Sequence, residues 1–559
     1  MYRLESPIIF YQHKYFIYLL TIKLIKQYIK LVVCLMKYGK KILALILCII
    51  TVTGISGCIN TITNNGENKT KEYNLSIALG VDRFNGFYPK VDFLNDQTVK
   101  INSNIFNCLV EFDEIFKIIP ALAETWNNPD NLTWRFKLRE DVKFHNGYNF
   151  TAEDVKYSID LIKQDKNNSL YGFLAMVKEV RIVNDSIVDI ITFDPYPILL
   201  NKLANVYILS KNYQENTTSE IPVGTGAYKF SEYLENNHLV LERFDDYWKK
   251  KSKFQKVTFK FIDDYEERLN SLVKGTVDIV DFVFPSSIEN LSQIEGIKII
   301  NYSHQVITYL SFDFKENDSC CFKGEKNPFS DIRVRKAIYH AIDIDEIIGN
   351  VFYGYAEPAS QFVTSYIFGY NPMIDRLSYN LEKARQYMKD AGYENGFDVV
   401  LDTTTVSANR INVSEKIVDQ LSKINISIIL NILPSSEFYN KIMNGNSSFY
   451  FVGWGVDSGD AGEIFDNILR SVDINNSFGL YNFGNYSNPD IDSIADDIFY
   501  NMNTRERLNL MQEGFAIAMQ DVACVPLYNY KGISAMINEI SWQPRADGII
   551  KLEDIDIIN

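Results

Sequence analysis

The sequence has few of the residues that most often carry chemistry. Its 559 residues include only five histidines and seven cysteines. No histidine stands in a GxSxG or HExxH context and no CxxC pair occurs, so neither a hydrolase nucleophile nor a structural zinc site is indicated. So few cysteines in so long a chain also exclude a disulfide framework. An enzyme is therefore the least favoured class, and the sequence predicts neither a cofactor nor a bound metal.

The chain also lacks a basic excess. Its formal net charge is −15, with 56 Lys and Arg against 71 Asp and Glu. No basic excess exists to neutralise phosphates, so a nucleic-acid partner is not expected. Apolar residues at 46% and charged residues at 23% are typical of a globular protein. A chain of this length exceeds one hydrophobic core, which predicts two or three domains.

One stretch, Pro120–Ile159, has a clear local pattern. Trp134–Arg139 alternates apolar and charged residues, as a half-buried strand requires. His145–Gly147 supplies a turn. Thr151 then begins an amphipathic helix, and Asp154, three positions on, can complete a capping box. The pattern predicts a strand, a turn and a capped helix, with His145 in a structural role.

The residues of this stretch closely resemble the signature of family 5 extracellular solute-binding proteins, the peptide and nickel binders of ABC importers. Many matches occur at fixed spacing, which makes the resemblance specific. The matching parts are Pro120-x-Leu-Ala-Glu-x-Trp126, Trp134-x-Phe-x-Leu-Arg139, Val142-x-Phe-His-x-Gly147 and Phe150-Thr-Ala-Glu-Asp-Val155.

Further matches extend the resemblance from about Pro120 to Tyr530. They include Pro222–Phe230, the region from Asn327 to Asp343, and Asn488–Asp492. The resemblance implies an α/β fold of the two-lobed periplasmic-binding-protein type. Two strands cross between its lobes, and an extra subdomain is inserted in the first lobe. In such a fold the ligand sits between the lobes and hinge closure buries it.

The resemblance also suggests domain bounds. The expected parts are a leader at 1–57, a lipidated cysteine and flexible tether at 58–71, lobe I at 72–100, 220–303 and 526–559, the inserted subdomain at 101–219, and lobe II at 304–525. Residues 1–35 do not fit a leader, and we expect Met36 to be the true start.

The leader has the order of a secretory signal. Met36–Lys41 is basic, Ile42–Val52 is apolar, and Ile55-Ser-Gly-Cys58 resembles a lipobox. We expect cleavage before Cys58 and lipidation of that cysteine, which anchors the protein to the extracytoplasmic face of the cell membrane. An uncleaved signal anchor is the alternative.

The ligand contact expected most strongly is Asp457. It follows Gly453-Trp-Gly-Val456 at the end of a predicted strand, and it matches the position where peptide-binding members hold an aspartate against the ligand's α-ammonium. A buried cation needs such a counter-charge. Trp454 would add an apolar wall. A solvent-exposed loop aspartate is the alternative, and Asp460 could take the role instead.

Other residues are expected around the cleft: Gly455, Tyr228, Arg410 and the Gly80–Tyr88 loop with Tyr88. Dipeptide-specific members carry an arginine for the ligand's carboxylate, and the corresponding position falls at about Thr404. Arg410 is near but out of register, which leaves longer peptides open.

The expected function is capture of a short peptide by a monomeric, lipid-anchored protein that delivers it to an ABC permease and its ATPase. A nickel-chelate or oligosaccharide binder on the same scaffold is an alternative, although no histidine follows His340. A surface receptor or adhesin without transport is an alternative of another class.

Overall fold

The computed structural model describes residues 73–80, 84, 86–88, 96–214, 221–317, 319, 320, 322, 326–405 and 407–558. The expected leader, Cys58 and the tether lie outside these residues. Glu72–Asn559 forms one compact unit, to which every feature below belongs. In the described part of the chain, no helix combines the length and the apolar character needed to cross a membrane.

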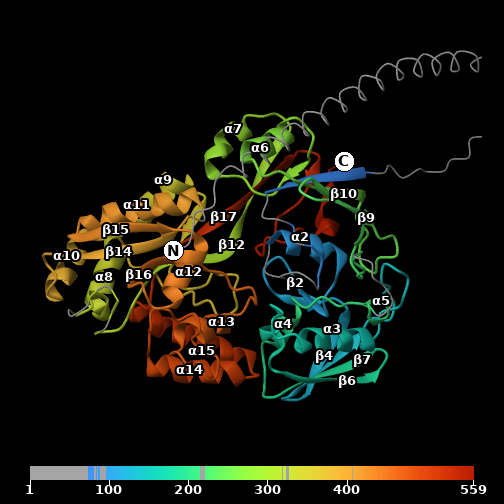
Figure 1. Cartoon of the computed structure of the whole chain (residues 1–559), viewed down its shortest axis with the longest axis horizontal. Helices are drawn as coiled ribbons and strands as arrows, with labels where there is room; N and C mark the ends of the chain where they lie inside the picture. The colour runs from blue at the N-terminus through green and yellow to red at the C-terminus, as the bar shows by residue number, and fades with distance from the viewer. Residues whose placement is uncertain are drawn as a thin grey trace, which may run out of the picture. The chain divides into compact units, whose positions relative to one another are not determined.

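A mixed sheet of eleven strands runs through this unit (Figure 1). Its strands are β1 (Tyr73–Leu79), β8 (Tyr228–Leu234), β9 (His238–Arg243), β10 (Phe254–Phe261), β11 (Ile279–Val280), β12 (Ile297–Phe312), β13 (Ala356–Pro358), β14 (Phe397–Thr404), β15 (Ile426–Leu433), β16 (Phe449–Trp454) and β17 (Val525–Ile537). Their order is β15-β14-β16-β12-β17-β11-β1-β10-β9-β8, with β13 paired to β17.

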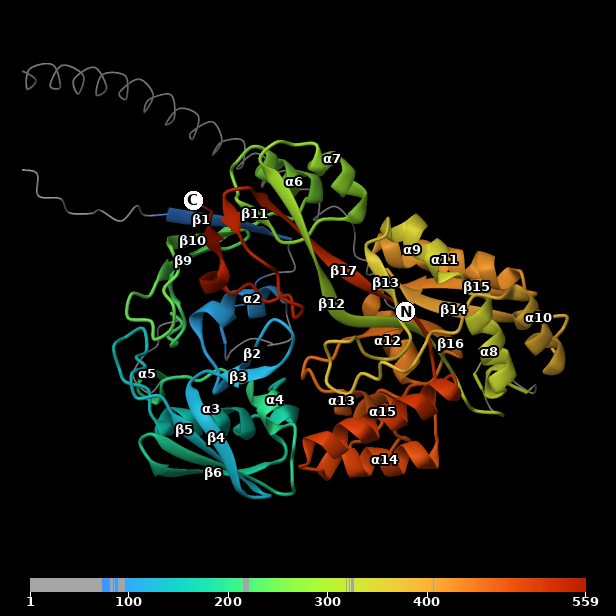
Figure 2. The ribbon, with the colours of Figure 1, turned by 180° about the vertical axis from the view of Figure 1, so that it is seen from behind.

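The two longest strands, β12 and β17, cross between two lobes (Figure 2). They pair antiparallel, from Ile297 opposite Ile537 to Leu310 opposite Val525. The first lobe comprises the chain before these strands and the chain after β17. The second lobe comprises residues 313–524, between them. The predicted α/β fold with two crossing strands is confirmed.

A smaller sheet of order β4-β5-β7-β6 lies in the first lobe. Its strands are β4 (Ala123–Asp130), β5 (Thr133–Leu138), β6 (Val177–Asn184) and β7 (Ile187–Thr192), and helix α3 (Ala152–Gln164) follows β5. The predicted capping box is present, because the backbone N–H of Thr151 donates to Asp154 Oδ2 at 2.8 Å. The strand, turn and helix of Pro120–Ile159 are thus confirmed.

The short strands β2 (Val110–Phe112) and β3 (Ile118–Pro120) pair in the first lobe, as do β18 (Ile540–Ser541) and β19 (Asp556–Ile557). The other helices of the first lobe are α2 (Asp96–Ile105), α4 (Leu199–Leu203), α5 (Lys211–Gln214), α6 (Tyr265–Val273) and α7 (Ile288–Ser292). Those of the second lobe are α8 (Ile332–Ala341), α9 (Ile344–Phe352), α10 (Leu381–Asp390), α11 (Ala408–Ser422), α12 (Ser435–Met443), α13 (Gly462–Ile464), α14 (Pro489–Tyr500) and α15 (Thr504–Gln520).

Helix α2 ends against the Gly224–Gly226 segment. The carbonyl of its last residue, Ile105, accepts a hydrogen bond from the backbone N–H of Gly226 at 2.9 Å.

The histidine of the signature turn has the structural role predicted for it. The backbone N–H of Gly224 approaches His145 Nδ1 at 3.3 Å, and His145 Nε2 lies 3.0 Å from the Gly226 carbonyl. Burial lowers the pKa of His145 to about 4, so the ring is neutral near pH 7. A Cβ at Gly224 would lie 2.0 Å from the Ile105 carbonyl oxygen, so this glycine permits close packing of the backbone.

Candidate ligand-binding site

A cavity of about 360 Å³ lies between the lobes, beside the crossing strands. We call it the interlobe cavity. Its walls come from three sources: Val99, Lys100, Phe112, Phe116, Phe173, Asn205, Asp547, Gly548 and Ile549 of the first lobe; Tyr302, His304, Gln305, Val306 and Tyr530 of the crossing strands; and Gly455 and Asp457 of the second lobe. A molecule held there can therefore contact both lobes and the strands that join them.

The pairing of the crossing strands is irregular where they border this cavity. Ser303 is opposite Lys531 and Ile307 is opposite Asn529, so three residues of β12 face only Tyr530 of β17. Such an irregularity turns side chains out of the normal alternation. All three residues, His304, Gln305 and Val306, line the cavity, and the His304 ring stacks on Tyr530 with centroids 4.9 Å apart.

Gln305 holds the aspartate expected to bind ligand. Its Nε2 donates to Asp457 Oδ1 at 2.8 Å. Asp457 lies in the turn after β16 and is exposed, whereas Gln305 is 8% exposed. The Oε1 atom of Gln305 is buried and has no hydrogen-bond partner among the described residues. Because the amide is neutral, it orients the carboxylate without cancelling its charge, which suits a cationic ligand group.

Glycine at position 455 packs closely against β12. A Cβ there would lie 3.1 Å from Val306 Cγ2, which is a tight contact, and 3.7 Å from Gln305 Nε2, which is an ordinary one. The expected cleft residue Gly455 thus lines the cavity and leaves room for Val306.

Asp460, the alternative to Asp457, has another partner. Its two carboxylate oxygens accept hydrogen bonds from Arg507 Nη1 and Nη2 at 2.7 and 2.8 Å, and both side chains are 5% exposed. Such a bidentate buried pair fixes the loop after β16 onto α15. Asp460 is therefore a structural residue, and Asp457 is the aspartate that faces the cavity.

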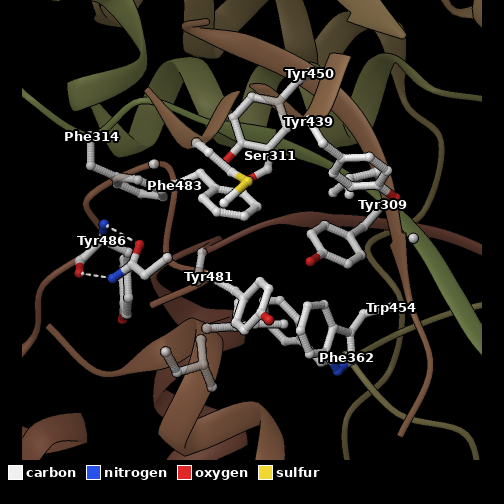
Figure 3. Close-up of a pocket in the computed structure, with 18 residues that line it drawn as sticks. Tyr309, Ser311, Phe314, Phe362, Tyr439, Tyr450, Trp454, Tyr481, Phe483 and Tyr486 are labelled. Atoms are coloured by element: carbon white, nitrogen blue, oxygen red, sulfur yellow. Dashed lines mark hydrogen bonds between the residues drawn. The ribbon is translucent and has the colours of Figure 1, made fainter. Parts of the chain in front are cut away.

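A second cavity, of about 110 Å³, lies within the second lobe and is lined mainly by rings (Figure 3). We call it the aromatic cavity. Its lining residues are Tyr309, Ser311, Phe314, Phe362, Tyr439, Met443, Tyr450, Val452, Gly453, Trp454, Ile468, Leu469, Tyr481, Asn482, Phe483, Gly484, Tyr486 and Ala523. Trp454 borders it, while the next residue along the chain, Gly455, borders the interlobe cavity. The two cavities are thus adjacent at the end of β16.

The two lobes also touch beside the interlobe cavity. Asn201 Nδ2, on α4, donates to the Ser458 carbonyl at 2.7 Å, and Lys202 Nζ lies 3.7 Å from Glu463 Oε2 on α13. The rings of Tyr196 and Phe499 lie with centroids 5.8 Å apart. These contacts join the first lobe to the loop that carries Asp457 and to helices α13 and α14 of the second lobe.

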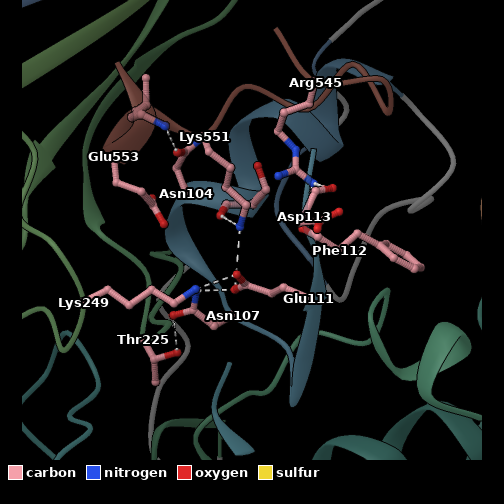
Figure 4. Close-up of polar contacts among 12 residues, drawn as sticks. Asn104, Asn107, Glu111, Phe112, Asp113, Thr225, Lys249, Arg545, Lys551 and Glu553 are labelled. Carbon is pink, nitrogen blue, oxygen red and sulfur yellow. Dashed lines mark hydrogen bonds and ion pairs between the residues drawn. The ribbon is translucent and has the colours of Figure 1, made fainter. Parts of the chain in front are cut away.

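The first-lobe wall rests on a buried charge network (Figure 4). Glu111 accepts a hydrogen bond from Lys249 Nζ at 2.7 Å and lies 3.7 Å from Lys551 Nζ. Burial opposes its ionisation, but the two lysines and hydrogen bonds from Lys249 and Asn107 hold the pKa of Glu111 at about 2.

Arg545 fixes the loop that precedes Lys551. Arg545 Nη2 donates to the Phe112 carbonyl at 2.9 Å and to Asp547 Oδ2 at 2.6 Å. Asp547 borders the interlobe cavity, and its carboxylate is paired with the Arg545 guanidinium. Lys100, which also borders the cavity, donates to Asp281 Oδ2 at 2.8 Å.

Three expected cleft residues lie elsewhere. Tyr228 is fully buried, and its hydroxyl donates to the Phe254 carbonyl at 2.8 Å. Tyr88 is 5% exposed and packs against Phe106 and Tyr207. Neither lines either cavity, because both rings belong to the core of the first lobe.

Arg410 is directed at the sheet. Its Nη1 donates to the Phe451 carbonyl at 2.8 Å, and its guanidinium lies over the Phe451 ring at 4.6 Å. It borders neither cavity. Cys58 and residues 81–83 and 85 of the Gly80–Tyr88 loop lie outside the described residues.

The sequence analysis did not find Gln305 or the rings of the aromatic cavity. Gln305 stands in a strand whose alternation is broken by an irregular pairing, and the strand partner is more than 200 residues away in sequence. The rings come from β12 and Phe314 just after it, from Phe362, from α12, from β16 and from residues 481–486, which only the fold brings together. Aromatic residues make up 14% of the chain, so no local pattern singles these out.

Comparison with known proteins agrees with this architecture. Residues 117–476 match the family described as "Bacterial extracellular solute-binding proteins, family 5 Middle". A dipeptide-binding protein of Escherichia coli is 27% identical over 419 residues, covering 69% of this chain and 76% of the relative. Heme-binding protein A of Haemophilus influenzae is 24% identical over 531 residues, covering 89% of this chain and 93% of the relative.

A solved structure has the same fold. The periplasmic binding protein DppA of Helicobacter pylori, in complex with the peptide STSA, superposes with a TM-score of 0.68 at 24% identity, covering 87% of this chain and 98% of that one. The relatives are solute-binding proteins and not enzymes. The family match spans well over half of the chain, and the chain therefore belongs to family 5 of the extracellular solute-binding proteins that serve ABC importers.

Proposed function

We propose that the protein captures a short peptide between its lobes and delivers it to the permease of an ABC importer. The observation that carries the proposal is Asp457, which stands at the wall of the interlobe cavity with one carboxylate oxygen held by Gln305. A peptide's α-ammonium is a cation with three hydrogen-bond donors, and the oriented carboxylate is its natural partner. The dipeptide-binding relative and the peptide-bound DppA support the same ligand class.

The mechanism we propose is capture, hinge closure and docking of the closed form to the permease and its ATPase, with no bond chemistry and with the protein acting as a monomer. A ligand that touches both lobes and the crossing strands stabilises the closed arrangement more than the open one. By population shift, that difference in affinity drives closure.

The carboxylate end of the peptide is left less constrained. Thr404, the position expected for a dipeptide-fixing arginine, is buried, and its hydroxyl lies 3.0 Å from Ser435 Oγ. Lys100 is the only lysine or arginine among the described residues that line the interlobe cavity, and it is bonded to Asp281. We therefore propose that peptides longer than a dipeptide are accepted.

Membrane attachment is part of the proposal. The lipobox-like Ile55-Ser-Gly-Cys58 supports a lipid anchor at Cys58, with the protein on the extracytoplasmic face of the cell membrane. Metabolic labelling with a fatty acid tests this: the parent chain is labelled, and Cys58→Ser is not. Equal labelling of both chains contradicts the anchor.

The binding role of Asp457 is tested by calorimetry with ligands identified by native mass spectrometry of the purified protein. Asp457→Ala is expected to weaken peptide binding by about 2–5 kcal/mol, because a desolvated ammonium loses its counter-charge. Asp457→Asn keeps the shape and removes the charge, and it should lose a similar amount. Asp398→Ala, an exposed aspartate that borders neither cavity, is the matched control and should bind as the parent does.

Chemical modification of the ligand tests the same contact from the other side. Acetylation of the peptide's amino group should weaken binding to the parent strongly, and binding to Asp457→Ala little further, because both changes remove one interaction. Additive losses would contradict the assignment of the ammonium to Asp457.

A nickel chelate is a second candidate, favoured by one observation. His304 lines the interlobe cavity together with Asp457. No cluster of three or more metal-ligating side chains occurs in the described part of the chain, so a metal would have to arrive with its own ligands. Calorimetry with a nickel–histidine complex distinguishes the candidates: tight binding that His304→Ala abolishes would favour the chelate.

A further inference from the structure

The aromatic cavity presents an uncharged surface. No lysine, arginine, aspartate, glutamate or histidine is among the described residues that line it. Several of its polar groups are paired within the protein: Ser311 Oγ donates to the Tyr450 hydroxyl at 3.1 Å, and the Tyr486 hydroxyl donates to Asp521 Oδ2 at 2.8 Å. Trp454 Nε1 is buried and has no hydrogen-bond partner among the described residues. The surface that a bound ligand group would contact consists mainly of ring faces, ring edges and aliphatic carbons.

The size of the cavity sets the size of its occupant. Protein interiors are close-packed, and an apolar cavity of about 150 Å³ in an engineered protein binds benzene. A cavity of about 110 Å³ can therefore hold one ring or one branched aliphatic group with little rearrangement. A charged group would lose its hydration there without gaining a partner, which disfavours lysine, arginine, aspartate and glutamate side chains.

The cavity lies within reach of a peptide held at Asp457. Trp454 borders the aromatic cavity and Asp457 borders the interlobe cavity, three residues further on. The protein chain from Trp454 to Asp457 therefore spans at most about 10 Å. An extended peptide ligand of about three residues covers the same distance. Tyr439 and Tyr481 border the cavity and are each 44% exposed, so its lining reaches the surface of the lobe.

We propose that the aromatic cavity is a specificity pocket for one large apolar side chain of the ligand, aromatic or branched aliphatic. The inference rests on the proposed capture of a peptide and extends it: Asp457 recognises the ammonium that all peptides share, and the aromatic cavity selects among peptides. Burial of one such side chain is worth about ten- to hundredfold in affinity.

The test measures the affinities of tripeptides built on Ala-Ala-Ala by calorimetry. Each position in turn carries Phe, Leu, Lys or Glu. At one position, Phe and Leu should bind at least tenfold more tightly than Ala, and Lys and Glu should bind no better than Ala. The parent chain overturns the inference if it binds these peptides with no apolar preference at any position, and that outcome leaves the role of Asp457 intact.

Variants that fill the aromatic cavity test whether the preference for an apolar side chain arises there. Val452→Phe adds a ring from β16, and Ala523→Leu adds carbons from another wall, so that one of them serves if the other fails to fold. Each should reduce the preference for Phe over Ala to less than threefold and leave Ala-Ala-Ala affinity unchanged. The control Val273→Phe, exposed on α6 and bordering neither cavity, should keep the preference. A preference that survives in both filled variants overturns the inference.

A probe without a peptide backbone separates this inference from the proposed function. Fluorobenzene at millimolar concentration, followed by fluorine NMR, should bind the parent and Val273→Phe but neither filled variant. If the parent binds no tripeptide, the proposed function fails, and the fluorobenzene result then decides the inference. Fluorobenzene binding that the filled variants lose supports an apolar pocket. Absence of fluorobenzene binding to the parent overturns the inference.

Discussion

The interlobe cavity and the aromatic cavity are adjacent at Trp454, but they are built in different ways. The interlobe cavity takes its walls from both lobes and from the crossing strands, and charged residues, Asp457 among them, line it. The aromatic cavity takes its walls from the second lobe and the adjoining end of β12, and none of its described lining residues is charged. The first must change shape when the hinge moves, whereas the second belongs to one folded body.

This difference separates two tasks of recognition. A charge at a hinged cleft couples binding to closure, because its interactions are completed when the walls approach. An apolar cavity within one lobe exists before closure, so it can select a side chain in the open form as well. Each prediction below changes one side of this comparison or the loop that joins the two cavities.

The largest effect is expected where the joining loop is anchored. Asp460→Ala leaves the Arg507 guanidinium buried without its carboxylate, which should lower the free energy of unfolding by about 3–5 kcal/mol. Urea unfolding measures the loss. Asp457→Ala, in the same loop but exposed, is the control and should unfold as the parent does. Equal stability of Asp460→Ala and the parent would contradict the structural role of the pair.

Trp454 borders the aromatic cavity directly beside Asp457's loop, so its removal should affect more than one class of peptide. Its Nε1 is buried with no hydrogen-bond partner among the described residues, and its ring lies 4.9 Å from that of Tyr481. We expect Trp454→Ala to weaken all peptides by about 2 kcal/mol, as truncation of a tryptophan anchor does, whereas filling the aromatic cavity weakens only those with a large apolar side chain. Calorimetry with Ala-Ala-Ala distinguishes the two: an unchanged affinity in Trp454→Ala would show that the indole serves one cavity alone.

A smaller effect is expected at the contact between the lobes. Lys202→Met removes the charge that faces Glu463 and keeps most of the side-chain stem, which should weaken binding by about 0.5–1 kcal/mol. The unliganded variant should also be more open in small-angle X-ray scattering. Lys156→Met breaks a pair within α3 and is the control, which should change neither. A scattering curve of Lys202→Met identical to that of the parent would argue against a closing role for this contact.

A pH dependence of stability is also expected in the second lobe. Asp466 lies in the π-helical turn Phe465–Leu469, whose Ile468 and Leu469 line the aromatic cavity. Burial raises the pKa of Asp466 to about 7, although Arg470 and Lys202 oppose the shift. The unfolded aspartate has a pKa near 4. Between these values the folded state binds more protons, so the free energy of unfolding should fall as pH rises from about 4 to about 7.

Asp466→Asn removes the proton uptake and should flatten this dependence, which urea unfolding at pH 4.5, 6 and 7.5 measures. The parent and the variant should differ most in slope between pH 4.5 and 7. Parallel profiles over this range would show that Asp466 does not titrate there in the folded state.

Much of the fold could be predicted because its signals are local. The alternation of Trp134–Arg139 depends only on which residues face the core, and the capping box of Thr151 and Asp154 closes within three residues. The position of Asp457 in a turn after a strand could be predicted for the same reason, from the apolar run that precedes it.

The rest of the site could not be predicted because it depends on contacts between distant parts of the chain. Tyr228 was expected at the cleft, yet its ring is buried in the first-lobe core. Arg410 lies near the right strand, but its guanidinium is satisfied by the Phe451 carbonyl and ring. No local pattern distinguishes a ring or a cation that faces a cavity from one that faces a core.

By itself the sequence determined the family, the α/β class, the signature strand and capped helix, and the aspartate that follows the strand ending in Trp454. Each of these depends on residues that are close in sequence, because backbone hydrogen bonding and side-chain alternation act over short distances. Only the tertiary structure decided which aspartate of the loop faces the interlobe cavity. It buried Asp460 against Arg507, placed Gln305 beside Asp457 through an irregular pairing of β12, and gathered rings from five distant segments into one cavity. Those outcomes depend on packing across hundreds of residues, where the position of a side chain is set by its neighbours in space.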